Sequence, residues 1–584
     1  MRLALALLVL LASVPARAQW SPAPAPLRAQ NGMVVSAERH ASEAGVAVMR
    51  QGGNAVDAAV ATGFALAVTF PVAGNVGGGG FMVVRFPDGR TTTLDYRETA
   101  PAAATRDMFL DSTGAFVPAR SQVGALAVGV PGAVAGLVYA QQAWGRLPLA
   151  DVLAPAVVLA ARGFPLSRDE AARLNSARVP FAQFPSTAAA FVPPTPYAEG
   201  DTLRQPDLAA VLRRIQQYGR DGFYTGETAR LIADEMQRSG GLITLADLAA
   251  YQPVERAPVV GTYRGHRVIA MGPPSSGGIA LLQMLASVEP FDVRAMGFNA
   301  SATVHLMGEA MRRAYADRAE WLGDPDFVDV PASGLLDSAY VAARMASFEP
   351  DRTTPDVTFG APNAAPRRES DQTTHYSVVD GQGMAVSTTT TLNGAYGSGL
   401  VVGGAGFLLN NEMDDFAAAP GVPNQYGLVG TEANAVAPGK RMLSSMTPTI
   451  VEAPDGRLRL VVGSPGGGRI ITTVFEAILN VVDHGMTVSE AVAAPRVHHQ
   501  WRPDVLFAER GALARDVAAN LRTRGWSVAE QADYWSRADA VLVSCDESTT
   551  ATDPSGLSRS VTTTAGCVLL GGADPRGEDT AVGF

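Results

Sequence analysis

The chain has 584 residues, of which 47% are hydrophobic and 17% are charged, and its formal net charge is −10. This composition indicates a well-packed globular protein and argues against a disordered chain. The negative charge, together with a sequence that contains no basic run, excludes nucleic acid as an expected partner.

The N-terminus has the three parts of a secretory signal. A positive start (Met1-Arg2), an apolar run (3–12) and an A-x-A cleavage motif (16–18) predict a signal peptide over residues 1–18. The alternative, an uncleaved anchor, is disfavoured because about 20 apolar residues are needed to cross a bilayer. We therefore expect a periplasmic or secreted protein without a stable membrane anchor.

The first third of the mature chain predicts a strand near residues 33–35 and then two helices. The first helix runs from Ser42 to the glycines at 52–53, and the second is capped by Asn54 and ends before Pro71. A glycine-rich stretch and a strand over 81–86 follow. A phosphate-binding loop needs strand, glycines and helix in that order, so we interpret the glycines as a tight packing turn.

The middle of the chain, roughly residues 120–345, is predicted to be mainly helical, and its clearest helix covers 301–322. From 352 to 372 the sequence becomes rich in Pro, Ala, Asn and Arg without periodicity. This pattern is typical of an exposed linker that can be cut. It ends at Gln372.

Thr373 follows this linker and opens a predicted hairpin. A strand from Thr374, a turn over 380–383 and a second strand over 384–393 form the hairpin, and a helix is predicted over 470–483. A threonine at the start of a strand is usually structural. If the chain is cut before it, however, the new α-amine, with a pKa of about 7.7–8, can act as base for the threonine's own hydroxyl.

The sequence contains only two cysteines, Cys545 and Cys567, and strand-like runs flank both. In an exported protein this arrangement predicts a disulfide. Two unpaired buried thiols are the alternative. Zinc binding is not expected, because neither cysteine has a histidine nearby in the sequence.

Several long motifs resemble the γ-glutamyltranspeptidases. They are TTHYSVVD from Thr373, NNEMDDF from Asn410, KRMLSSMTPT from Lys440 and GSPGGGRI from Gly463. Residues 33–84, 95–98, 301–327 and 574–576 fit the same pattern, so the resemblance covers nearly all of the mature chain. Two positions depart from it: Met442 stands where many members have Pro, and Gly468 where many have Ser.

The resemblance implies an α+β fold, a four-layer α/β/β/α sandwich of the N-terminal nucleophile hydrolase type. It also implies a precursor that cuts itself between Gln372 and Thr373. The products would be a large subunit, 19–372, with the exposed linker 352–372 at its end, and a small catalytic subunit, 373–584. The two would stay together as one heterodimeric fold.

The resemblance also implies a set of site residues. Thr373 would be the nucleophile, Thr391 would orient it, and the backbone N–H groups of Gly466 and Gly467 would form the oxyanion hole. Substrate-binding residues would be Arg97, Ser444 and Ser445 at the α-carboxylate and Asn393, Glu412 and Asp415 at the α-ammonium. Tyr426 would belong to a lid over residues 420–438. Neither a metal nor a cofactor is expected, and His498 and His499 are expected to be structural.

The activity implied is that of a γ-glutamyltransferase and glutathione hydrolase. It would use glutathione or other γ-glutamyl compounds and transfer the acyl group to water, amino acids or peptides. One alternative is an acylase for glutaryl or β-lactam side chains on the same fold. Another is an exported binding protein that never matures.

Overall fold

The computed structural model describes residues 23–357, 373–545, 550–552, 558–560 and 567–584. The predicted signal peptide, most of the predicted linker and Gln372 lie outside the described residues. No helix within the described part of the chain is long and apolar enough to cross a membrane.

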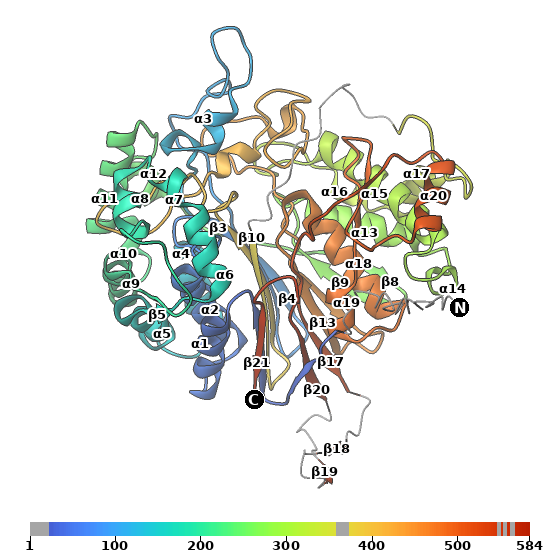
Figure 1. Ribbon diagram of the computed structural model, residues 1–584, viewed down its shortest axis with the longest axis horizontal. Coiled ribbons are helices and arrows are strands. Elements are labelled where there is room, and N and C mark those ends of the chain that lie inside the picture. Colours follow the sequence, from blue (N-terminus) through green and yellow to red (C-terminus); the bar gives the residue numbers. More distant parts are fainter. Residues whose placement is uncertain (1–22, 358–372, 546–549, 553–557, 561–566) are drawn as a thin grey trace, which may run out of the picture.

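Two seven-stranded antiparallel sheets lie face to face at the centre of the molecule (Figure 1). The first contains, in spatial order, β21 (Thr580–Gly583), β2 (Gly32–Ser36), β10 (Thr373–Asp380), β11 (Ala385–Thr391), β3 (Gly79–Arg85), β4 (Thr91–Tyr96) and β7 (Val254–Arg256). The second contains β1 (Leu27–Ala29), β20 (Val568–Gly572), β17 (Asp539–Ser544), β13 (Leu458–Gly463), β12 (Thr449–Glu452), β9 (His266–Ala270) and β8 (Val259–Tyr263).

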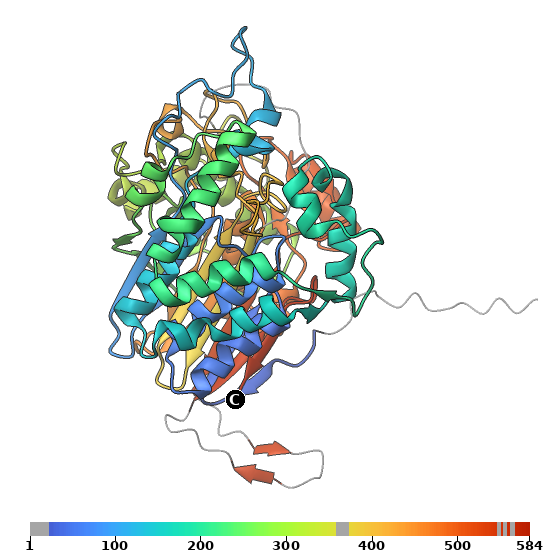
Figure 2. The same cartoon turned by 90° about the vertical axis from the view of Figure 1, so that its left-hand side faces the viewer.

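Helices cover the outer face of each sheet (Figures 1 and 2). The first sheet is covered by α1 (Arg39–Arg50), α2 (Ala55–Thr69), α4 (Ala133–Trp144), α5 (Leu149–Arg162) and α9 (Pro206–Tyr218), and the second by α13 (Gly277–Val288), α15 (Ser301–Trp321), α18 (Ile470–Val482) and α19 (Val488–Ala493). The order helix, sheet, sheet, helix confirms the predicted α+β four-layer sandwich.

Shorter elements complete the described chain. The helices are α3 (Pro118–Gln122), α6 (Arg168–Ser176), α7 (Arg178–Phe181), α8 (Pro185–Phe191), α10 (Asp221–Tyr224), α11 (Gly226–Ser239), α12 (Leu245–Ala250), α14 (Val293–Met296), α16 (Ala332–Leu335), α17 (Ser338–Met345) and α20 (Arg515–Thr523). The strands are β5 (Phe164–Pro165), β6 (Thr202–Leu203), β14 (Val497–His498), β15 (Leu506–Ala508), β16 (Val528–Glu530), β18 (Thr550–Thr552) and β19 (Ser558–Ser560).

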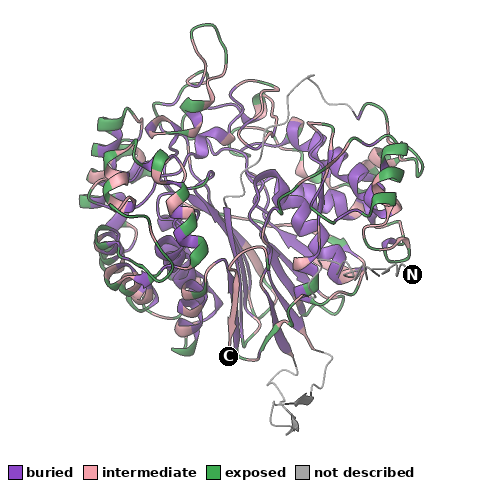
Figure 3. Cartoon of the chain, viewed as in Figure 1, coloured by how far each residue is buried: buried purple, intermediate pink, exposed green. Residues whose placement is uncertain are grey.

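The inner strands, such as β2, β3, β10 and β11, are buried along their whole length, so the sheets form the centre of the protein (Figure 3). In β2, Val34 packs into the core beneath the helices, whereas Met33 and Val35 pack into the core between the two sheets. Val378 and Val379 of β10 divide in the same way. Successive side chains of a strand point to opposite faces, so a run of apolar residues is needed to fill both cores.

Most of the predicted elements are present. Helix α1 begins three residues earlier than predicted, at Arg39, because the carboxylate of Glu38 accepts hydrogen bonds from its first free N–H groups. Helix α2 has the predicted Asn54 cap, with Asp57 completing a capping box. Helices α15 and α18 match their predicted ranges to within one residue.

The helical prediction for residues 120–345 is incomplete, because the two-residue strands β5 and β6 and the longer strands β7, β8 and β9 fall within it. The hairpin of β8 and β9 turns at Arg264 and Gly265, whose φ angles of 49° and 77° are left-handed. These strands are short, and β9 and β7 are stabilised by pairing with β12 and β4, which are distant in sequence. Pairing between strands that are distant in sequence gives no signal in the neighbouring residues.

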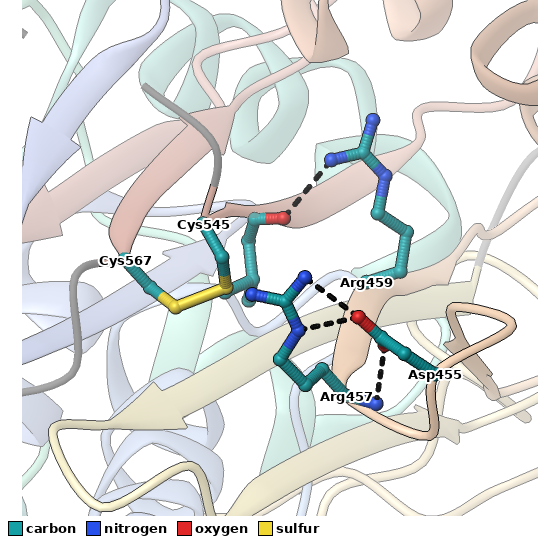
Figure 4. Close-up of a disulfide and its surroundings, with 6 residues drawn as sticks. Asp455, Arg457, Arg459, Cys545 and Cys567 are labelled. Atoms are coloured by element: carbon teal, nitrogen blue, oxygen red, sulfur yellow. Dashed lines mark hydrogen bonds and ion pairs between the residues drawn. A yellow bond between two sulfur atoms is a disulfide. The ribbon is translucent and has the colours of Figure 1, made fainter. Parts of the chain in front are cut away.

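The predicted disulfide between Cys545 and Cys567 is present (Figure 4). The two cysteines follow β17 and precede β20, where Ser544 is paired with Val568. Antiparallel register therefore brings them opposite each other. The alternative of two unpaired thiols is wrong.

Candidate active site

Thr373 is the first residue of β10, near the middle of the first sheet, and it pairs with Thr391 at the end of β11. Both side chains are buried. The Oγ1 atoms of the two residues are 3.4 Å apart. The predicted nucleophile and the predicted orienting residue are therefore neighbours on one face of the hairpin.

The glycine turn before β3 fixes the position of Thr391. Asn75 Nδ2 donates to the Thr391 carbonyl over 2.9 Å, and Asn75 Oδ1 accepts from the N–H of Gly78 over 3.0 Å. A Cβ on Gly78 would lie 2.1 Å from the Thr391 carbonyl oxygen. Only glycine allows this approach, as expected for a packing turn.

A second glycine-rich turn connects β13 to α18. Gly466 and Gly467 have φ angles of 132° and 54°, which favour glycine. A Cβ on Gly466 would lie 2.0 Å from Ser536 Oγ, and one on Gly467 would lie 2.5 Å from the Tyr426 ring. Glycine therefore allows the backbone of this turn to pack closely against Ser536 and Tyr426.

Arg97 follows β4 directly and is buried among acidic side chains. It donates to the Glu412 carboxylate, to Asp415 Oδ2 over 2.5 Å and to the Met442 carbonyl over 3.3 Å. Burial alone would lower the pKa of this guanidinium, but the charges of Glu412, Asp415 and Glu98 outweigh burial and raise the pKa.

The carboxyl groups around Arg97 are also perturbed. Burial raises the pKa of Glu412, of Asp415 and of Glu98, the last to about 7, and the charge of Arg97 opposes each of these shifts. Glu412 and Asp415 share one turn, η2 (Glu412–Asp415), so both carboxyls face the same guanidinium. Three carboxyls beside one buried cation leave the site suited to a further positive group.

These residues line one pocket of about 270 Å³. Its walls are Arg97, Thr373, Thr391, Asn393, Glu412, Asp415, Tyr426, Leu428, Ser444, Ser445, Met446, Gly467 and Ile470. Every predicted catalytic or substrate-binding residue is among them except Gly466, which adjoins Gly467 in the turn. Sequence reasoning missed the apolar wall formed by Leu428, Met446 and Ile470.

Sequence reasoning also missed Arg318, on α15. Its Nη2 donates to Ser445 Oγ over 3.1 Å and its Nε to Ser276 Oγ over 3.0 Å. In the described part of the chain no carboxylate lies within 4 Å of this guanidinium, although it is buried and burial lowers its pKa. Its role depends on contacts with Ser276 and Ser445, which are distant in sequence, so no signal in the neighbouring residues identifies it.

Tyr426 closes the pocket from the segment 420–438. Its ring is buried, and its hydroxyl donates to the carbonyl of Asn393. The base of the segment is held by Asn424 Nδ2, which donates to Asp415 Oδ1 over 2.8 Å. A lid role for this segment stays a prediction.

Comparison with known proteins identifies the family. The family model described as Gamma-glutamyltranspeptidase matches residues 41–583. The chain belongs to the γ-glutamyltranspeptidase family. The glutathione hydrolase proenzyme of Escherichia coli is 50% identical over 507 residues, which are 86% of this chain and 87% of that protein.

Solved structures agree with this family assignment. Cephalosporin acylase from Bacillus halodurans superimposes with a TM-score of 0.82 at 26% identity, covering 98% of this chain and 99% of that one. A chain of the γ-glutamyltranspeptidase from Helicobacter pylori has a TM-score of 0.54 at 44% identity and covers 58% of this chain and 95% of that one. The four-layer sandwich is thus shared with both.

Proposed function

We propose that this protein is a γ-glutamyltransferase and glutathione hydrolase with Thr373 as its nucleophile. The observation that carries the proposal is that Thr373 and the ion-paired group of Arg97, Glu412 and Asp415 line one small pocket. Membership of the γ-glutamyltranspeptidase family supports it.

Maturation requires no other protein. In the precursor, Thr373 Oγ attacks the carbonyl carbon of Gln372, the peptide C–N bond breaks, and the acyl group moves from nitrogen to oxygen. This shift frees the α-amine of Thr373, which takes up the hydroxyl proton. Water then hydrolyses the ester, which releases the carboxylate of Gln372 and restores the Thr373 hydroxyl. Intramolecular positioning can be worth an effective concentration of about 10⁵–10⁸ M, so such a step is feasible.

The freed amine then serves as the base of the mature enzyme. It takes the proton of Thr373 Oγ as this oxygen attacks the γ-carbonyl carbon of the substrate. The N–H groups of Gly466 and Gly467 receive the developing oxyanion, and the leaving amine departs with the proton. An oxyanion donor can contribute about 3–4 kcal/mol to transition-state stabilisation. Water or an amine then attacks the γ-glutamyl ester on Thr373.

The α-amino-acid end of the substrate carries a carboxylate and an ammonium, and the pocket offers a partner of opposite charge for each. Its carboxylate would pair with Arg97, helped by Ser444 and Ser445, and its ammonium would lie against Glu412, Asp415 and the Asn393 side chain. A glutaryl group has no ammonium and would leave the carboxyls without this partner. This charge pattern favours a γ-glutamyl donor over a glutaryl donor.

We also propose export, processing into 19–372 and 373–584, and amino acids or peptides as acceptors. The signal-like residues 1–18 support export. The position of Thr373 at the start of β10, directly after the linker, supports the cleavage site. The share of this chain covered by the Helicobacter pylori chain, a little over half, is close to that of the proposed large subunit.

Intact-mass analysis and N-terminal sequencing of the purified protein test maturation. We expect two chains, the smaller beginning at Thr373. One unbroken chain would contradict the proposal and favour a binding protein that never matures.

Comparing turnover of γ-glutamyl-anilide with that of glutaryl-anilide tests substrate class. We expect the γ-glutamyl compound to be preferred, because only it carries the α-ammonium. The likeness to a cephalosporin acylase makes an acylase the second candidate. Preference for the glutaryl compound would establish the acylase instead.

A further inference from the structure

A chain of buried hydrogen bonds runs from helix α18 to the lid segment 420–438. Thr472 Oγ1 lies 2.9 Å from His498 Nδ1, and His498 Nε2 lies 2.9 Å from Gln500 Oε1. Gln500 Nε2 in turn donates to the carbonyl of Tyr426 over 3.2 Å. All four side chains are buried.

The chemistry of the groups gives the chain one direction. Burial lowers the pKa of His498 well below its ordinary value, so the imidazole is neutral and carries a single N–H. The amide oxygen of Gln500 can only accept, and therefore His498 is protonated on Nε2 and its Nδ1 is an acceptor. The one hydroxyl proton of Thr472 is shared between this nitrogen, at 2.9 Å, and the Arg469 carbonyl, at 3.0 Å. The amide N–H₂ group of Gln500 is thereby directed at the Tyr426 carbonyl, and it also donates to the Arg502 carbonyl over 3.3 Å.

Gln500 lies between the lid and the glycine turn that holds the proposed oxyanion donors. A Cβ on Gly427, in the lid, would be 3.1 Å from Gln500 Nε2, and a Cβ on Gly468 would be 3.0 Å from Gln500 Oε1. The turn is also bound from the other side, since the Tyr315 hydroxyl donates to the carbonyl of Gly468. One amide therefore bonds to the lid and lies close beside the glycine turn.

We propose that Gln500 is a positioning residue that holds the lid closed over Thr373 and so favours transfer to amines over hydrolysis. The inference rests on the proposed function. The Tyr426 ring seals the pocket only while its backbone is held, and a closed lid limits access of water to an acyl-enzyme. Gln500 acts through Tyr426 and does not touch the reacting atoms.

Gly468 also affects how the Gln500 amide is held. Many members of the family carry Ser at this position, and here a serine side chain would start 3.0 Å from Gln500 Oε1. Its hydroxyl could donate to that oxygen in competition with His498. With glycine here, His498 is the one hydrogen-bond donor to the amide oxygen of Gln500 among the described residues.

The first experiment uses the mature Gln500→Met enzyme, which keeps the volume and loses the amide. Hydrogen–deuterium exchange of peptides covering 420–438 should become about 2- to 10-fold faster, the range implied by the net value of one hydrogen bond. The ratio of glycylglycine transfer to hydrolysis should fall by a similar factor. The matched control is Gln283→Met, which loses buried hydrogen bonds to Asp317 and the Leu335 carbonyl away from the lid. It should change neither readout.

The proposal would be overturned if the Gln500→Met enzyme had the same lid exchange and the same ratio of transfer to hydrolysis as the wild type. It would also be overturned if the Gln283→Met control changed both readouts equally. If Gln500→Met does not fold, Gly468→Ser tests the same contact, with Gly468→Ala as its control for added bulk. Only the serine should speed lid exchange, and equal effects of both would overturn the proposal. Exchange is measured without substrate, so a wild type that turns over no γ-glutamyl compound would refute the proposed function separately.

Discussion

At the scale of single residues, the site depends on groups whose ordinary chemistry is altered by burial. Thr373 is 4% exposed and Arg97 is 1% exposed, so each acts in a dry environment where a charge or hydroxyl must have a defined partner. Arg97 has Glu412 and Asp415, and the hydroxyl of Thr373 has that of Thr391. The proposed nucleophile and the proposed substrate clamp are each held before a substrate arrives.

Thr373→Ala should abolish both self-cleavage and turnover, because it removes the only atom proposed to attack either carbonyl. Intact mass should show one chain. Thr374→Val is the matched control: Thr374 pairs with Thr390, its side chain points to the other face of the strand, and its hydroxyl has no hydrogen-bond partner among the described residues. Normal cleavage in Thr373→Ala would show that the nucleophile is misassigned.

Glu98 should make stability depend on pH. Burial raises its folded-state pKa from the ordinary 4.5 to about 7. The folded protein therefore binds this proton more tightly, and the stabilisation is complete below about pH 4.5 and is lost as the pH rises to about 7. Glu98→Gln removes the effect, so its free energy of unfolding relative to the wild type should rise by about 3 kcal/mol or less between pH 5 and 7.5.

Denaturant unfolding at several pH values checks this expectation. Glu199→Gln makes the same change at an exposed position, where the carboxylate forms a surface ion pair with Arg168, and serves as the control; its effect on stability should be small. A constant difference between Glu98→Gln and the wild type across this range would mean that Glu98 titrates normally.

At the scale of elements, the hairpin of β10 and β11 is placed by its neighbours. Strand β3 pairs with β11 along its whole length, from Gly79 opposite Thr391 to Arg85 opposite Ala385. Helix α2, buried throughout, packs against both strands of the hairpin. The glycine turn joins α2 to β3, so its geometry decides where Thr391 lies.

Gly78→Ala should displace the end of β11, because the new Cβ would lie 2.1 Å from the Thr391 carbonyl oxygen. We expect a loss of about 1–3 kcal/mol in stability and slower self-cleavage, measured by denaturant unfolding and by intact mass over time. Gly334→Ala, where the added Cβ meets nothing within 4 Å, should leave both unchanged or slightly raise stability. Equal behaviour of the two variants would show that the turn does not position Thr391.

The sequence predicted those elements whose signals are local. The cap at Asn54, the hairpin after Thr373 and helix α15 are each specified by neighbouring residues. Strand β7 pairs with β4, and strand β9 pairs with β12, and both partners are far away in the chain. Strand β8 pairs with β9 in a local hairpin, which was not predicted either. In the site, Arg318 and Gln500 were missed because their roles depend on contacts across the fold.

At the scale of the whole molecule, segments before and after Thr373 are interleaved. In the first sheet, β10 lies between β2 and β11, and β11 lies between β10 and β3. In the second, β12 lies between β13 and β9. A cut before Thr373 therefore breaks one bond but leaves a common set of sheets and cores.

The two proposed subunits should stay together after cleavage. Native size-exclusion chromatography should give one species, whereas denaturing electrophoresis should give two bands with or without reductant. Reductant should have no effect on the band number because the Cys545–Cys567 disulfide lies within the small subunit. Separation of the subunits under native conditions would contradict the shared sheets.

The sequence by itself determined the family, the nucleophile candidate and the local elements, because a motif or a periodic pattern is a property of neighbouring residues. The tertiary structure alone decided that Arg97 lies between Glu412 and Asp415, the latter 318 residues away, and that Gln500 bonds to the lid beside the glycine turn. Such contacts depend on how two sheets and two helical layers stack. The stacking depends on hydrophobic cores to which residues from the whole chain contribute, so no single segment determines it.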